Sequence, residues 1–201
     1  MNQLEKQPIV LASSNAGKIK EIQAMLPDYN IVTQSSFNII EAQETAATFI
    51  ENALIKARNA AMQSQLPAIA DDSGLIVNAL NGAPGVISAR YAGLNASDAE
   101  NNAKLLSKMS GIAQEQRTAY FICVMVFVRH ANDQCPLITQ GLWKGRILTR
   151  TQGNNGFGYD SLFWLPELNC SSAELQPEVK NMLSHRGQAL RQLTALIKEY
   201  Y

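Results

Sequence analysis

The hydrophobic positions of this chain alternate between short continuous runs and helically spaced sets. Residues 9–12 and 31–33 are mostly apolar runs of strand length, and each predicts a short strand. Between them, Ile19, Ile22 and Leu26 recur at the spacing of one helix face. The first part of the chain therefore predicts a strand, a helix and a second strand.

Two further helices are predicted to begin at capping boxes, in which a Ser or Thr is followed three residues later by Glu. Thr48-x-x-Glu51 opens a helix that runs to about Met62, and Ser97-x-x-Glu100 opens another. We expect the first of these helices to turn the following apolar side chains inward: Phe49, Ile50, Ala53, Leu54 and Ala57.

The second half of the chain holds the longest apolar run, at residues 120–129, which is typical of a central strand covered on both faces. Residues 137–147 predict an antiparallel partner that ends in a bend at 143–145. A short strand at 161–165 and a last helix over roughly 187–198 follow. Strands and helices alternate early and a hairpin comes late, so the pattern predicts an α/β fold with a mixed sheet flanked by helices.

Composition and charge narrow the class of protein. The 201 residues are 46% hydrophobic with a net charge of zero, which fits a single domain spanning 1–201 and argues against broad electrostatic binding to nucleic acid or membrane. The three cysteines form no CxxC pair, which fits a reducing compartment. No signal peptide or transmembrane run is evident, so we expect a cytoplasmic protein.

The richest candidate for chemistry is an acidic pair, Asp71 and Asp72, that follows an apolar run and precedes Ser73-Gly74. We expect a buried strand to deliver this pair into a turn that contains Gly74, where hard cations such as Mg²⁺ could bind. Because adjacent strand residues point to opposite faces, the two aspartates should not share one role unless the strand ends there. An ordinary surface turn is the alternative reading of the same four residues.

Other segments could bind an anionic ligand. The loop 13–18, SSNAGK, precedes a helix whose N-terminus and Lys18 could bind phosphate, although an ordinary N-cap by Ser13 or Asn15 explains it equally well. On the next helix, Asn52, Lys56 and Asn59 form one polar face behind Glu44, which a solvated surface would also explain.

Two later segments suggest recognition of a base. The sequence Phe157-Gly158-Tyr159-Asp160 interleaves aromatics with glycine and could stack on a ring, or could simply pack in the core. Donors to carbonyl or phosphate oxygens could come from Lys180, His185 and Arg186, although a lone histidine is more often structural.

In this order, these segments resemble the inosine triphosphate pyrophosphatase family. The resemblance is carried by SSNAGK, ETAATFIENALIKA, PAIADDSGLIVNALNGAPGVISARYAG, GFGYDSLF and SHRGQAL. It implies Mg²⁺-dependent hydrolysis of non-standard purine nucleoside triphosphates (ITP, dITP and XTP) to the monophosphate and pyrophosphate by a homodimer. It also implies an elongated sheet with two lobes around a central nucleotide-binding cleft.

The resemblance also assigns roles by position. Asp72 would be the catalytic base and, with Glu44, a metal ligand. The substrate-binding residues would be Ser13, Ser14, Asn15, Ala16, Gly17, Lys18, Lys56, Ser73, Phe157, Gly158, Tyr159, Asp160, Lys180, His185 and Arg186.

Two other functions remain open at this point. One is a pyrophosphatase for pyrimidine or modified nucleotides, which a panel of nucleotides would distinguish. The other is a nucleotide-binding module without turnover. Glu44, Asp72 and Lys18 argue against the second, because a sensor needs no positioned base.

Overall fold

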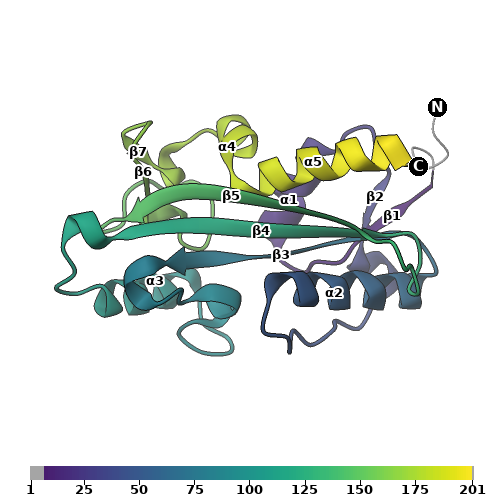
Figure 1. The fold of residues 1–201 in the computed structure, drawn as a ribbon, viewed down its shortest axis with the longest axis horizontal. Coiled ribbons are helices and arrows are strands. Elements are labelled where there is room, and N and C mark those ends of the chain that lie inside the picture. The colour runs from purple at the N-terminus through teal and green to yellow at the C-terminus, as the bar shows by residue number, and fades with distance from the viewer. Residues whose placement is uncertain (1–6, 201) are drawn as a thin grey trace. The chain divides into compact units, whose positions relative to one another are not determined.

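The computed structural model describes residues 7–200. Residues 1–6, where no signal peptide is expected, and residue 201 lie outside the described part. A seven-stranded sheet has the order β2-β1-β3-β4-β5-β6-β7 (Figure 1). Its strands are β1 (Ile9–Leu11), β2 (Ile31–Thr33), β3 (Ala68–Val77), β4 (Thr118–Val128), β5 (Leu137–Ile147), β6 (Phe163–Leu165) and β7 (Cys170–Ser171).

Helices flank this sheet, which confirms the predicted α/β class. They are α1 (Ala16–Met25), α2 (Phe49–Ser64), α3 (Asp98–Lys108), α4 (Pro177–Leu183) and α5 (His185–Tyr200). Short 3-10 helices lie between them, among them η4 (Gly85–Arg90), η6 (Asp160–Leu162) and η7 (Ser172–Glu174). No helix within residues 7–200 combines the length and the apolar character that crossing a bilayer requires.

The chain divides into two compact units. The first comprises the chain up to Asp72, Cys123–Gly141 and the chain from Arg186 onward. The second comprises Ser73–Ile122 and Leu142–His185. Strands β3, β4 and β5 each contribute residues to both units.

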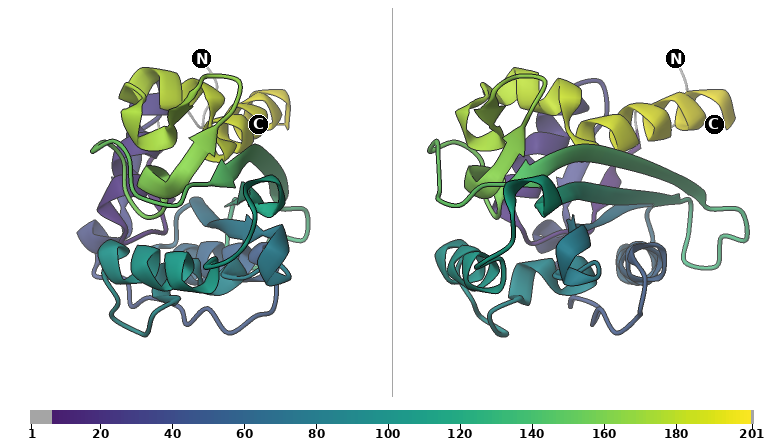
Figure 2. Two further views of the ribbon diagram at one scale, coloured as in Figure 1. Left: turned by 90° about the vertical axis from the view of Figure 1, so that its left-hand side faces the viewer. Right: turned by 60° about the vertical axis from the view of Figure 1, so that its left-hand side comes forward.

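In the first unit, β1 pairs in parallel with β2 and β3 and is buried at all three positions. Ile9 and Leu11 pack with α1 and α5 in one apolar cluster that includes Ile22 and Leu193. Helix α2 covers the opposite face of this part of the sheet (Figures 1 and 2). Strands covered on both faces explain why residues 9–12 are apolar without alternation.

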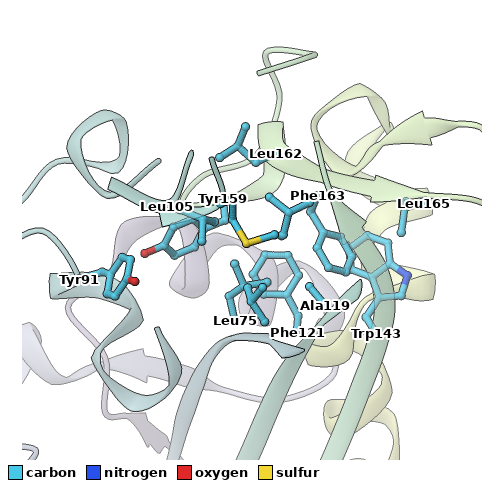
Figure 3. Packing of buried hydrophobic residues seen from close by; sticks show 13 residues of the cluster. Leu75, Tyr91, Leu105, Ala119, Phe121, Trp143, Tyr159, Leu162, Phe163 and Leu165 are labelled. Carbon is cyan, nitrogen blue, oxygen red and sulfur yellow. The ribbon is translucent and has the colours of Figure 1, made fainter. Parts of the chain in front are cut away.

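The core of the second unit is rich in aromatic side chains. Figure 3 shows Phe121 of β4, Trp143 of β5 and Phe163 of β6 in this cluster. Leu105 of α3 lies in the same cluster, as does Tyr159, which precedes β6 in the chain. The Phe121 and Phe163 rings lie 4.5 Å apart between centroids, in a tilted arrangement that aromatic pairs favour. The segment that carries Tyr159 is therefore attached to the core.

Four local predictions are wrong. The strand does not end at the acidic pair, because β3 continues to Val77. The bend expected at 143–145 is strand, since β5 runs to Ile147. A Cβ at Gly145 would lie 2.5 Å from the Trp164 carbonyl oxygen, so this glycine allows β6 to approach rather than the chain to turn.

The other two wrong predictions concern the exposure of one side chain and the first residue of one strand. Ile50 is 43% exposed instead of facing inward. The expected strand at 161–165 begins only at Phe163, because Asp160–Leu162 forms a 3-10 turn.

Candidate active site

The acidic pair lies within β3 and is buried. Asp71 is 0% exposed and Asp72 is 4% exposed, so the surface-turn alternative is wrong. The expectation that alternation would separate the two side chains is confirmed by their different partners. Asp71 contacts charges on α1 and α5, whereas Asp72 contacts Lys56 of α2.

Asp71 is surrounded by positive charge. Lys18 Nζ lies 2.9 Å from its Oδ2, and Arg186 Nε lies 3.6 Å from the same atom. Burial would raise the pKa of Asp71, but the charges of Lys18, Arg186 and Lys56 outweigh burial and hold the pKa well below its usual range. Asp71 is therefore a permanent anion at neutral pH.

Arg186 is 2% exposed and has a second carboxylate partner. Its guanidinium donates to Glu21 Oε2 on α1 at 2.5 Å. Burial opposes its charge, but Asp71 and Glu21 outweigh burial and raise the pKa of Arg186. The sequence singled out Arg186 but missed Glu21, although Glu21 lies one helical turn beyond Lys18.

Asp72 shares a lysine with Glu44. Lys56 Nζ lies 2.7 Å from Glu44 Oε1 and 3.6 Å from Asp72 Oδ1. Burial raises the pKa of Asp72, and Lys56 and Lys18 offset this only in part. The pKa of Lys56 is raised, because Asp71, Asp72 and Glu44 outweigh the effect of its burial. A buried carboxylate with a raised pKa suits proton transfer.

The polar face of α2 holds the segment that carries Glu44. Asn52 is fully buried and bonds both the N–H and the C=O of Ala46, at 3.0 and 3.4 Å. Asn59 donates to the Ile40 carbonyl at 2.8 Å. The alternative interpretation, that these residues form a merely solvated face, is therefore wrong. The helix uses these side chains to place Glu44 beside Lys56.

The donor set of Glu44 and Asp72 fits a hard divalent cation. Both carboxylates lie within 3.6 Å of one ammonium group, so they converge on a common cationic position. No group of three or more His, Cys, Asp or Glu side chains that could bind a metal occurs among residues 7–200. Two carboxylates suffice for Mg²⁺, which usually takes its other ligands from water and phosphates.

The loop before α1 has the form of an anion site. Asn15 caps the helix by accepting from the Lys18 N–H at 3.0 Å, and Ser13 Oγ accepts from the Asn15 N–H at 3.3 Å. Ser14, Asn15 and Ala16 are exposed. The N-cap alternative and the phosphate hypothesis are compatible here, because the cap orders the first turn of the helix while the loop stays accessible.

In the second unit, Asp160 is the centre of the predicted FGYD segment. Its carboxylate accepts from the Phe157 N–H at 2.9 Å, from Ser172 at 2.9 Å and from Lys180 Nζ at 2.5 Å. Gly156 has a φ of 78°, and any side chain there would collide with the Asp160 carboxylate. Lys180 Nζ also lies 4.8 Å from the centroid of the Phe157 ring. Asp160 and Lys180 thus fix the position of Phe157.

His185 and Tyr159 are buried in the same unit. The His185 ring stacks on Phe121 at 4.8 Å between centroids, and Tyr159 Oη donates to the Ser88 carbonyl at 2.8 Å. Both residues are 4% exposed. The core-packing alternative therefore describes Tyr159 well, whereas Phe157 is only half-buried and remains accessible.

A pocket of about 490 Å³ adjoins this segment, and no sequence motif predicts that a helix forms one of its walls. It is lined by residues 151–161 on one side and by α3 on the other, among them Asp98 and Asn102. Sequence spacing alone cannot associate two elements that are about 50 residues apart.

Known proteins resemble this chain over most of its length. The model of the Ham1 family matches residues 9–196. A dITP/XTP pyrophosphatase of Vibrio vulnificus is 57% identical over 193 residues, which cover 95% of this chain and 96% of that protein. The protein of the same name from Pseudomonas syringae is 56% identical over 183 residues, 90% of this chain and 92% of its own length.

Solved structures agree with this fold. A HAM1 protein from Coxiella burnetii is 49% identical with a TM-score of 0.88, over 96% of this chain and 99% of that one. The Ham1 protein of Staphylococcus aureus is 40% identical with a TM-score of 0.86, over 97% and 100%. The resemblance predicted from the motifs is confirmed, and the chain belongs to the Ham1 family.

Proposed function

We propose that this protein is a nucleoside-triphosphate pyrophosphatase that hydrolyses the purine nucleotides dITP, XTP and ITP to the monophosphate and pyrophosphate. Relatives named dITP/XTP pyrophosphatases at 53–57% identity support the activity. The structural observation that carries the proposal is the buried Asp72, which shares Lys56 with Glu44.

In this proposal Asp72 is the general base. It removes a proton from a water molecule whose oxygen attacks the α-phosphorus, and the bond to the bridging α–β oxygen breaks. The electron pair leaves with pyrophosphate. Burial raises the pKa of Asp72, which strengthens the carboxylate as a base, while Lys56 keeps the raised pKa in check.

The phosphates are held by residues around α1. Lys18, with the loop 13–17 at the start of α1, would bind the triphosphate, and Asp71 keeps the Lys18 ammonium in place. Glu44 and Asp72 would hold Mg²⁺, which supplies neutralisation of phosphate charge during the reaction. Ser73 follows Asp72 directly and is proposed to bind phosphate as well.

The base would be bound by residues of the second unit. Half-buried Phe157 would stack on the base, and Lys180 and His185 would supply donors for the 6-oxo group that hypoxanthine and xanthine share. Gly158, Tyr159 and Asp160 shape the segment. Adenine carries a 6-amino donor instead, and leaving buried donors unpaired costs about 1–3 kcal/mol each, which would favour the oxopurines.

The experiment is a panel of dITP, XTP, ITP, GTP and ATP, with monophosphate and pyrophosphate quantified together. We expect equal amounts of the two products from dITP and XTP and much slower turnover of ATP. Asp72→Asn should reduce kcat by about 10²–10⁴. Release of orthophosphate instead, or a variant that keeps more than about a tenth of wild-type kcat, would contradict the proposal.

Two further parts of the proposal concern the protein's state in the cell. A homodimer is implied by the family resemblance, and light scattering after gel filtration would test it. A cytoplasmic location fits three free cysteines, Cys123, Cys135 and Cys170, and a nucleotide substrate. We propose no nucleic-acid or membrane partner, since the net charge is zero.

A further inference from the structure

Two side chains of helix α3 form hydrogen bonds with the backbone of Gly158, in the segment proposed to bind the base. Asp98 Oδ2 accepts a hydrogen bond from the Gly158 N–H at 2.6 Å. Asn102 Nδ2 donates to the Gly158 carbonyl at 2.9 Å. The two side chains are four residues apart and so lie on one face of the helix, one turn from each other. Together they bind both backbone polar groups of one residue.

This glycine is the neighbour of Phe157. Phe157 is half-buried, and its own N–H is bound within the segment by Asp160. Gly158 has a φ of 61° and nothing within 4 Å of a Cβ built on it, so the backbone conformation, rather than lack of space, favours glycine here. Fixing both polar groups of Gly158 fixes the peptide planes on either side of it, and with them the direction of the Phe157 side chain.

Packing accounts for only part of the attachment, at Tyr159, which shares the aromatic core with Leu105 of α3. The pocket of about 490 Å³ is lined by both α3 and residues 151–161, so side chains fill only part of the space where the two meet. The far end of the segment is held differently, by hydrogen bonds of Asn155 to Ala173 and Leu175 at 2.9 and 3.1 Å. Next to Phe157, the two bonds to Gly158 add a polar attachment to α3.

Helix α3 is itself firmly placed. A capping box of Ser97 and Glu100 fixes its first turn directly beside Asp98. Leu105 and Met109 are fully buried in the aromatic core. Asn101 bonds the backbone of Ala89 and Ala92, so the same helix also holds the end of η4. A rigid helix that donates and accepts at one loop residue can set that residue's position.

We propose that Asp98 and Asn102 are positioning residues that hold Phe157 in place for the purine base. The inference rests on the proposed function, because it takes Phe157 to stack on the base. Neither residue touches the substrate in this proposal. Both act through the Gly158 backbone, and their removal weakens base binding without altering the chemistry at phosphorus.

The test compares Asp98→Ala and Asn102→Ala with two controls. Asp98→Asn keeps an acceptor oxygen for the Gly158 N–H. Glu100→Ala breaks the capping box of the same helix turn but leaves both bonds to Gly158, so it controls for a general weakening of α3. Steady-state kinetics with dITP are measured for all four variants, together with inhibition by inorganic tripolyphosphate, which has no base.

We expect KM for dITP to rise about 5- to 20-fold in the two alanine variants at nearly unchanged kcat, the scale set by one lost hydrogen bond. Asp98→Asn should recover most of the loss, and Glu100→Ala should resemble the wild type. The inhibition constant of tripolyphosphate should not change in any variant. Equal KM values in Asp98→Ala, Asn102→Ala and Glu100→Ala would overturn the proposal, as would a parallel loss of tripolyphosphate affinity.

Hydrogen exchange without nucleotide separates failure of this inference from failure of the proposed function. Amide exchange in residues 151–161 should accelerate in Asp98→Ala and Asn102→Ala but not in Glu100→Ala. If the wild type fails to hydrolyse dITP, the proposed function is wrong and this exchange result still decides whether α3 holds the segment. Unchanged exchange in both alanine variants would show that the two bonds do not hold it.

Discussion

At the scale of single residues, two adjacent aspartates have opposite electrostatic environments. Lys18 and Arg186 stabilise the anion of Asp71, whereas the carboxylate of Asp72 has a pKa that burial raises. A lowered pKa means that the folded state favours the charge, and a raised pKa means that it disfavours the charge. The same substitution should therefore change stability in different directions at the two positions.

Asp71→Asn should lower the free energy of unfolding by about 3–5 kcal/mol at pH 7, because it leaves the buried Arg186 and Lys18 without one carboxylate partner. Asp72→Asn should leave stability unchanged or raise it, since the pKa of Asp72 is raised and its charge costs free energy above that pKa. Urea denaturation with EDTA present measures both. Equal destabilisation by the two variants would mean that Asp71 and Asp72 do not have opposite electrostatic environments.

Lys18→Ala should raise KM for dITP by about 10-fold or more, the scale of one hydrogen bond to a charged group. Lys20 lies on the same helix and is exposed, so Lys20→Ala is a matched control. It should leave KM unchanged and should change the free energy of unfolding by no more than about 0.5 kcal/mol. Kinetics of both variants side by side provide the measurement. If KM of Lys18→Ala equals that of the control, Lys18 does not bind phosphate.

Which residues could be found from sequence depended on how far apart their partners are. Lys18, Lys56 and Glu44 lie in recognisable segments and were predicted. The bond of Glu21 to Arg186 joins positions 165 residues apart, and that of Asn102 to Gly158 joins positions 56 apart. No local spacing encodes such pairs, because the fold alone brings them together.

At the scale of elements, the connection between β4 and β5 is closed by one charged pair. Asp133 is 1% exposed and accepts from the Arg129 guanidinium at 2.9 and 2.6 Å, and from the N–H groups of Arg129 and Cys135 at 3.0 Å. These bonds, the Arg129 guanidinium first among them, hold the pKa of Asp133 well below its usual range.

Asp133→Asn should destabilise the fold by about 1–3 kcal/mol at pH 7, because an amide cannot accept all of these bonds. Since the folded-state pKa is lowered, the contribution of the carboxylate is complete above the unfolded pKa of about 3.9 and is lost as pH falls below it. Unfolding of both proteins between pH 7 and 3 tests this. If the difference in the free energy of unfolding between the wild type and Asp133→Asn stays constant down to pH 3, the ionic explanation is contradicted.

Most elements were predictable because their hydrophobic periods and caps are strong. The capping boxes placed the starts of α2 and α3 correctly. The errors at Ser73-Gly74 and Gly145 have one cause, since both predictions treat glycine as the end of a strand. In the structure β3 and β5 continue, and Gly145 serves the close approach of β6 instead.

At the scale of the whole molecule, the proposed reaction needs more positive charge than the protein supplies. Lys18 and Lys56 are each already paired with carboxylates. A triphosphate would add several negative charges to this cluster. A divalent cation held by Glu44 and Asp72 would offset them.

Removal of metal by EDTA should therefore abolish pyrophosphate release, and added Mg²⁺ should restore it. Zn²⁺ should substitute poorly, because carboxylate and water ligands suit Mg²⁺ better than zinc. Glu44→Gln should raise the Mg²⁺ concentration needed for half-maximal activity by about 10-fold or more, the scale of one lost interaction with a charged group. Full activity of the EDTA-treated protein without added metal would contradict the carboxylate-site proposal.

The most direct test of the central claim is hydrolysis of dITP in water enriched in ¹⁸O, with mass spectrometry of both products. Attack at the α-phosphorus places the labelled oxygen in the monophosphate. We expect one ¹⁸O atom per dIMP formed and unlabelled pyrophosphate. Label in the pyrophosphate, or orthophosphate as the labelled product, would show that another phosphorus is attacked and would contradict the proposed pyrophosphatase reaction.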